Sequence, residues 1–189
     1  MKRAYSALIL AFALLTSVLH AQTEDWVTLT SEELGYSVEF PQEPEPSERT
    51  VASAVGELTL NIHMYDASIS GIPDNNLIYM TNVTDYPGEP FDKRSEADRD
   101  GVFDGAINGA VTNINGSLVS EEEIELQGVE GRSVKISIYE GQAFVYMRLF
   151  LKGNSLYLLQ VITLGENDGN DELDAFMSSF KFIHVKSKN

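Results

Sequence analysis

Two histidines are the side chains best suited to acid–base or metal chemistry after residue 21. His63 lies on the polar side of an alternating segment, which favours exposure to solvent over a role in catalysis. His184 lies in an apolar terminal segment, where we expect a packed or sheet-edge residue. The pair lacks the spacing of an HExxH zinc motif and makes a weak case for a metal site. We therefore expect neither histidine to be essential.

Nucleophilic chemistry finds little support in the sequence. The chain has no cysteine, which excludes thiol catalysis and thiolate zinc ligands. The pentapeptides GYSVE, NGSLV, GRSVK and GNSLY all lack the second glycine of a GxSxG nucleophile elbow. A dispersed carboxylate pair leaves no motif, so a carboxylate-based hydrolase remains an alternative. The sequence singles out no catalytic, cofactor-binding or metal-ligating residue.

The acidic segment 165–174, GENDGNDELD, is dense in the oxygen ligands that Ca²⁺ prefers. Its spacing departs from the D-x-[DN]-x-[DN]-G pattern of calcium loops. A turn followed by a helix explains the composition more simply, with Asn170 or Asp171 capping the free N–H groups. A calcium-binding module that uses this loop is kept as a further alternative. The glutamate run 121–125 is interpreted as the wet face of a strand.

Arg148 stands between Tyr146 and Phe150 on one face of an expected strand. This arrangement could form a cation–π cluster that faces a ligand. An arginine that extends its stem under a helix explains the same pattern.

Three glycines break the rules of the expected long helix. Gly101, Gly105 and Gly109 recur every four residues and share one side of the helix. Each costs a helix interior roughly 1 kcal/mol relative to alanine, so some compensation is expected. Either the bare side packs tightly on the sheet or a neighbouring element, or it faces outward and admits a ligand or partner. We favour packing, because the adjacent apolar stripe through Val102 and Ala106 must be buried.

The elements that position these residues can be read from periodicity and turn chemistry. The segment 35–40 alternates as a half-buried strand and ends at Pro41, which cannot donate a ladder hydrogen bond. The segment 47–67 predicts a hairpin that turns near Gly56. Further strands are expected at 26–30, 76–84, 117–126, 132–139, 143–152, 155–164 and 182–185, and helices at 92–113 and 171–180.

The order of these elements predicts a single α+β domain with a central antiparallel sheet. The strands 143–152 and 155–164 are apolar on both faces, so we expect them at the centre of the sheet, covered on both sides.

The first 21 residues have the layout of a cleaved secretory signal. Lys2 and Arg3 precede an apolar run at 7–18, and Ala21 supplies the small residue before the cut. Polar residues interrupt the run, which disfavours an uncleaved membrane anchor, and a chain without cysteine cannot be a lipoprotein. We expect one domain at 22–189, secreted or periplasmic, with no stable membrane insertion after cleavage.

The expected mature chain is strongly acidic. The whole chain carries a net charge of −16, and loss of the two cations of the signal makes it −18. Such a domain repels nucleic acid and anionic lipid, so neither is an expected partner. The charge serves solubility or a cationic partner. The partner is expected to be a small molecule or a protein whose identity the sequence leaves open.

Four short stretches together resemble PsbP-like domains, the superfamily of the photosystem II extrinsic subunit. They are YSVEFP (36–41), GVEGR (128–132), GNSLYLL (153–159) and FMSSFKF (176–182). The resemblance spans almost the whole mature chain and implies an α/β/α sandwich, a central antiparallel sheet between helices. Among exported bacterial members, the resemblance implies small proteins of undefined role rather than enzymes. The lysine-rich docking surface of the plant subunit has no clear counterpart, so a photosynthetic role is not carried over. We therefore expect an exported, non-enzymatic accessory or binding module without a cofactor.

Overall fold

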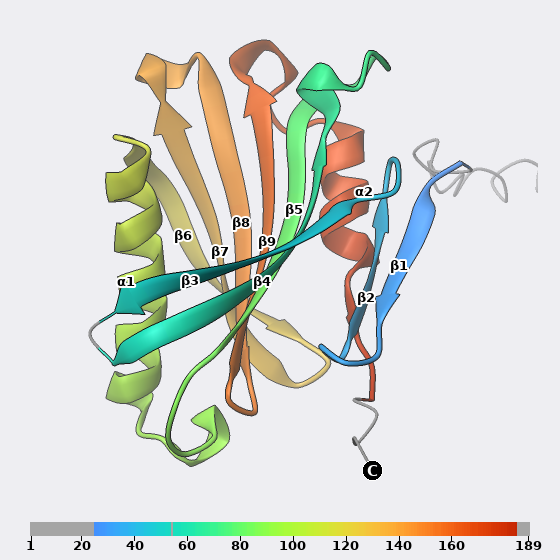
Figure 1. The fold of residues 1–189 in the computed structure, drawn as a ribbon. Helices are drawn as coiled ribbons and strands as arrows, with labels where there is room; N and C mark the ends of the chain where they lie inside the picture. Colours follow the sequence, from blue (N-terminus) through green and yellow to red (C-terminus); the bar gives the residue numbers. More distant parts are fainter. Residues whose placement is uncertain (1–24, 54, 185–189) are drawn as a thin grey trace, which may run out of the picture.

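The computed structural model describes residues 25–53 and 55–184, so the expected secretory signal lies outside the described residues (Figure 1). Two antiparallel sheets form within these ranges. The large sheet has seven strands, in the spatial order β3 (Glu45–Ser53), β4 (Gly56–Asp66), β5 (Asn76–Asp85), β9 (Ser155–Leu164), β8 (Ala143–Lys152), β7 (Val129–Ile138) and β6 (Ser117–Leu126). The small sheet has the order β1 (Val27–Ser31), β2 (Tyr36–Phe40) and β10 (Lys181–Phe182).

The two expected helices are present as α1 (Glu96–Asn113) and α2 (Asp171–Ser179). Helix α1 begins later than predicted, because Ser95 caps it by accepting from the Asp98 N–H at 3.2 Å, while Phe91–Lys93 forms a separate 3₁₀ turn. Helix α2 begins after Asn170, whose side chain accepts from the Leu173 N–H at 2.9 Å. The predicted cap of α2 is confirmed.

Different elements cover the two faces of the large sheet. Helix α1 covers the β7–β8 part of one face, where Phe103 and Ile107 pack with Val134, Met147 and Leu149. Helix α2 and the small sheet lie on the opposite side of the molecule in Figure 1 and cover the other face. Strand β9 is central and β8 lies beside it, as predicted. The described residues thus form a single α+β domain with two helices and a large antiparallel sheet.

The small sheet is held to the large one by aromatic packing. Tyr36 on β2 is completely buried and stacks on Phe180, with ring centroids 5.5 Å apart. The Tyr157 hydroxyl of β9 donates to the Leu34 carbonyl at 2.9 Å. The strand predicted at 182–185 is shorter than expected, because pairing with β2 ends at Phe182 and residue 185 lies outside the described residues.

Candidate functional site

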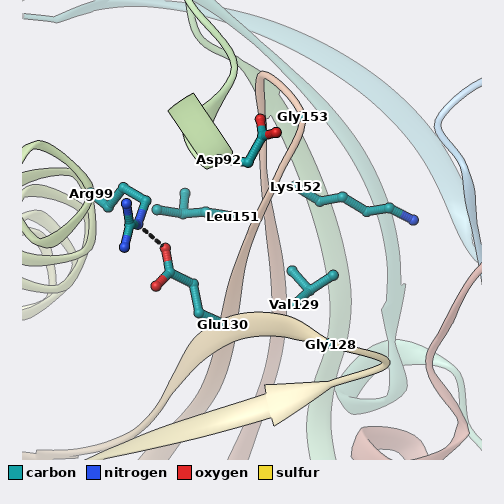
Figure 2. Close-up of a pocket in the computed structure, with 8 residues that line it drawn as sticks. All are labelled: Asp92, Arg99, Gly128, Val129, Glu130, Leu151, Lys152 and Gly153. Atoms are coloured by element: carbon teal, nitrogen blue, oxygen red, sulfur yellow. Dashed lines mark ion pairs between the residues drawn. The ribbon is translucent and has the colours of Figure 1, made fainter. Parts of the chain in front are cut away.

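Two adjoining hollows lie where the N-terminal end of α1 meets the β6–β7 and β8–β9 turns, and Figure 2 shows the larger of them. They measure about 510 and 380 Å³ and share Arg99 and Glu130. We call them together the α1 groove. The larger hollow is lined by Asp92, Arg99, Gly128, Val129, Glu130, Leu151, Lys152 and Gly153. The smaller is lined by Glu96, Arg99, Asp100, Glu123, Ile124, Glu125, Glu130 and Arg132.

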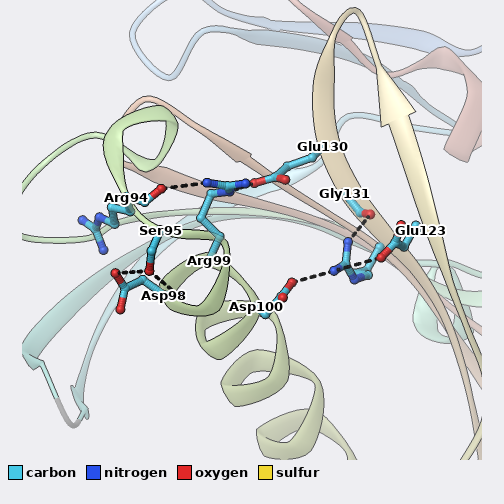
Figure 3. Close-up of polar contacts among 9 residues, drawn as sticks. Arg94, Ser95, Asp98, Arg99, Asp100, Glu123, Glu130 and Gly131 are labelled. Atoms are coloured by element: carbon cyan, nitrogen blue, oxygen red, sulfur yellow. Dashed lines mark hydrogen bonds and ion pairs between the residues drawn. The ribbon is translucent and has the colours of Figure 1, made fainter.

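Arg99 sits at the point where the hollows join. It lies one turn after the Ser95 cap, and its guanidinium donates to the Arg94 carbonyl at 2.7 Å (Figure 3). Its Nε forms an ion pair with Glu130, at the start of β7. A two-residue turn with positive φ at Gln127 (53°) and Gly128 (79°) reverses the chain there and brings Glu130 under the helix.

Arg132 anchors the smaller hollow. Its guanidinium pairs with Asp100 of α1 at 2.7 Å and lies 3.5 Å from Glu123 and 3.7 Å from Glu121, both on β6. It also lies 4.7 Å from the centroid of the Phe103 ring, within cation–π range. The Arg132 side chain is only 14% exposed. The guanidinium therefore joins α1, β7 and β6 into one charged network.

Four charged groups of the α1 groove have no ion pair within residues 25–53 and 55–184. Glu96 and Glu125 line the smaller hollow, and Asp92 and Lys152 line the larger. The Lys152 ammonium lies 4.4 Å from the Phe182 ring centroid, and burial lowers its pKa. The lining holds six carboxylates and three cations, so the groove is net acidic. Its chemistry suits the binding of a cationic group.

His63 does not lie in this groove, and the expectation that it faces solvent is wrong. Its Nδ1 lies 2.8 Å from the Tyr36 hydroxyl, which also lies 2.8 Å from the Thr81 hydroxyl. The ring is half-buried, and this burial lowers the pKa of His63 from its ordinary value of 6.5. The polar side of β4 is covered because β2 packs across it. Alternation along one strand cannot reveal such a covering layer.

His184 also differs from expectation, because it is exposed and lies beyond the end of β10. Arg148 extends under a helix, which is the second of the two arrangements expected for it. Its guanidinium donates to the Met177 carbonyl at 2.9 Å, near the end of α2. Burial lowers the pKa of Arg148. The rings of Phe144 and Tyr146 instead lie near Lys135 of β7, whose ammonium is 4.2 Å from the Phe144 centroid and 5.1 Å from that of Tyr146.

The acidic loop 165–174 is tied into the fold by its polar side chains. Asp168 accepts from the Lys135 ammonium at 2.7 Å and from the Tyr146 hydroxyl at 2.5 Å. The hydrogen bonds and charge of Lys135 outweigh desolvation and lower the pKa of Asp168. Among the described residues, no group of three or more His, Cys, Asp or Glu is placed to hold a metal ion. The glutamates of 121–125 are exposed, as predicted for the wet face of β6.

The packing explanation for the α1 glycines is wrong. A Cβ added to Gly101, Gly105 or Gly109 would meet nothing within 4 Å. The apolar stripe is buried through Phe103 and Ile107 instead, and the glycines lie to the side of it and outward. A stripe can be buried while its neighbours on the helix stay open, because the sheet contacts only one strip of a cylinder.

Sequence reasoning missed two arrangements. The ion pairs of Arg99 and Arg132 join residues far apart in the chain, although Glu130 and Arg132 at alternate positions of β7 do share one face. The second missed arrangement is a pair of neighbouring carboxylates, Asp74 and Glu172. Asp74 is half-buried, and this burial raises its pKa; the negative charge of Glu172 raises it further. Asp74 Oδ1 accepts from the Asn76 N–H at 2.7 Å and from the Tyr79 hydroxyl at 2.8 Å.

Comparison with known proteins bears on the fold. The chain is similar to the solution structure of cyanobacterial PsbP (CyanoP) from Synechocystis sp. PCC 6803, with a TM-score of 0.50 and 14% identity over 83% of this chain and 92% of that one. The fold is PsbP-like. This confirms the resemblance found in the sequence and, at this identity, shows the fold alone.

A weaker match is PA94 from Pseudomonas aeruginosa, a protein of unknown function described as a putative regulator. Its TM-score is 0.31, with 8% identity over 75% of this chain and 85% of that one. No family model matches the PsbP-like chain, and no curated protein matches it. None of the helices in the described part of the chain is long and apolar enough to cross a membrane.

Proposed function

We propose that this PsbP-like protein is a non-enzymatic binding module whose α1 groove receives a basic segment of a partner protein. The observation that carries the proposal is the pair of unpartnered carboxylates, Glu96 and Glu125, in a hollow whose other charges hold one another. A lysine or arginine of the partner would pair with these two carboxylates. The ion pairs of Arg99 and Arg132 would hold the walls of the hollow in place while the partner's side chain binds.

The charge of the chain supports the same direction. A net charge of −16 attracts a basic partner and raises its association rate at low salt. Guanidinium groups donate hydrogen bonds but accept none, so Arg99 and Arg132 suit orientation of a ligand better than proton transfer.

Binding of a fluorescent lysine- and arginine-rich peptide, followed by anisotropy, tests the proposal. Glu96→Gln with Glu125→Gln is expected to weaken binding by roughly tenfold, on the order of two surface ion pairs. The matched control is Glu48→Gln with Glu57→Gln, two exposed carboxylates of the β3–β4 hairpin. Equal loss in both double variants would show that the peptide senses only overall charge, and the groove would not be its site.

A carboxylate-based hydrolase is the second candidate, favoured by the raised pKa of Asp74 beside Glu172. In this role Asp74 would be the protonated acid and Glu172 the base. The hydrogen bonds that Asp74 accepts from Asn76 and Tyr79 favour a structural role instead. Hydrolysis of a panel of aryl glycosides and esters that is abolished by Asp74→Asn would replace the binding proposal with this one.

We also propose the finer features that the resemblance suggests. Helices on the two faces of the large sheet support an α/β/α sandwich of the PsbP type. The layout of residues 1–21 supports a cleaved secretory signal, with the domain at 22–189 secreted or periplasmic.

A further inference from the structure

The face of the large sheet that carries α1 is only half covered. The α1-facing side chains of β8, such as Val145 and Met147, are buried to 2% exposure. Strand β5 turns Tyr79 and Val83 into the core on the opposite side, so Met80 and Asn82 face the α1 side. Burial on this side declines from β8 through β9 to β5 and β4.

We call the less covered part the open half-face. Strand pairing places Ile62, Asn82 and Leu158 in one cross-strand row, with Met64 and Met80 in the next. Ile78 follows on β5. All six side chains are half-buried. Four of them (Ile62, Met64, Ile78 and Met80) pack against neither of the two buried cores.

One flank of α1 borders the open half-face. Phe103 points at the sheet, and Asp100 points toward Arg132 and β6. At 100° per residue, Val102, Ala106 and Gly109 therefore lie on the other flank, on the β9 side. Gly109 leaves that flank bare, because a Cβ there would meet nothing within 4 Å.

The centre of the open half-face holds an unpartnered hydrogen-bond acceptor. The Asn82 amide donates to the Thr84 hydroxyl at 3.1 Å, but its Oδ1 is buried and accepts from no residue that the structure describes. A buried acceptor without a donor is costly, and a ligand that brings the donor recovers that cost. The neighbouring Met64 and Met80 have flexible side chains that can move aside for it.

The charged residues near the open half-face determine whether the head group of a ligand can be charged. The α1-facing positions of β4, β5 and β9 carry no cation, and the charged residue among them is Asp66. A cation on the same face is Arg49 of the edge strand β3, which pairs with Leu60. An anionic head group at Asn82, such as that of a fatty acid, would meet the Oδ1 acceptor and the charge of Asp66, with no counter-ion on these three strands. We propose that the open half-face binds a neutral amphiphile. This ligand has an apolar body and one hydroxyl or amide group that donates a hydrogen bond to Asn82 Oδ1. This site is separate from the α1 groove.

Calorimetry on the full chain with three matched probes tests the inference: decan-1-ol, decyl methyl ether and decanoate. Decan-1-ol should bind saturably and roughly fivefold tighter than the ether, the effect of about one hydrogen bond, and decanoate should bind weakest. Asn82→Leu should reduce the alcohol-to-ether ratio to about one while the ether still binds.

Gly109→Leu supplies a second, independent variant, because a leucine in open space should leave the fold intact and fill the border of the site. It should abolish binding of alcohol and ether alike, whereas Asn108→Leu on the exposed side of α1 should not. The inference is overturned if decan-1-ol does not bind saturably or if Asn82→Leu keeps the alcohol preference. It is also overturned if Gly109→Leu and Asn108→Leu weaken binding equally. Glu96→Gln with Glu125→Gln should leave these affinities unchanged, which separates this site from the α1 groove.

Discussion

Replacing Gly105 by alanine should make the protein more stable. Gly105 lies in the middle of α1, is exposed, and has open space where the new methyl group would lie. The methyl therefore meets no steric cost. The variant gains stability because alanine has less backbone entropy than glycine in the unfolded chain, so folding loses less of it. Had the glycines packed tightly against the sheet, the same change would destabilise by overpacking.

The magnitude follows from helix propensity. Alanine in place of an exposed helical glycine is worth about 1 kcal/mol, so Gly105→Ala should raise the free energy of unfolding by about that amount. For a domain of this size the melting temperature should rise by roughly 2–4 °C. The double variant with Gly101→Ala should gain about 2 kcal/mol, since both positions are open.

Urea unfolding followed by circular dichroism, with a thermal melt beside it, measures both quantities. Gly131→Ala is the matched control, because its Cβ would clash with the Leu149 carbonyl oxygen and the Phe150 ring across the β7–β8 pair. That variant should lose stability. A lower melting temperature for Gly105→Ala would refute the conclusion that the glycine side of α1 is open and would restore the packing explanation.

Three further predictions concern other parts of the chain. The pKa of His63 is lowered in the folded state, so unfolding takes up protons as the pH falls below about 6.5; stability should be full above that pH and decline below it, and His63→Gln should flatten this part of a stability-versus-pH curve. Arg132→Gln should cost about 2 kcal/mol by breaking the pairs with Asp100 and β6, measured by urea unfolding, whereas Arg49→Gln on exposed β3 should cost far less; equal losses would contradict the network. Intact mass of protein recovered from a secreting host should place the N-terminus at Gln22, and full-length protein retained in the membrane would contradict export.

Most elements of the fold could be predicted because each rests on a local pattern. The β3–β4 hairpin at Gly56, the consecutive strands β6 to β9 and the Asn170 cap depend on turn chemistry and alternation within a few residues. The start of α1 was misplaced for a local reason as well, since Ser95 is the better cap but 91–93 continues the helical pattern as a 3₁₀ turn.

The candidate site was much harder to predict. Arg99 and Glu130 are paired only because the β6–β7 turn carries β7 back beneath α1, and Asp100 meets Arg132 across the same contact. The exposure of His63 was misjudged because its neighbour Tyr36 comes from a strand 27 residues earlier. Contacts between distant residues leave no trace in spacing.

The sequence by itself determined the strand and helix content of this protein, its acidity, and the absence of cysteine chemistry. Those properties depend on side-chain identity and on periods of two or 3.6 residues. Only the tertiary structure decided which polar faces are covered, which charges meet, and that the glycines of α1 are open. Each of these depends on how one layer packs on another, and burial and pairing are properties of two surfaces rather than of one segment.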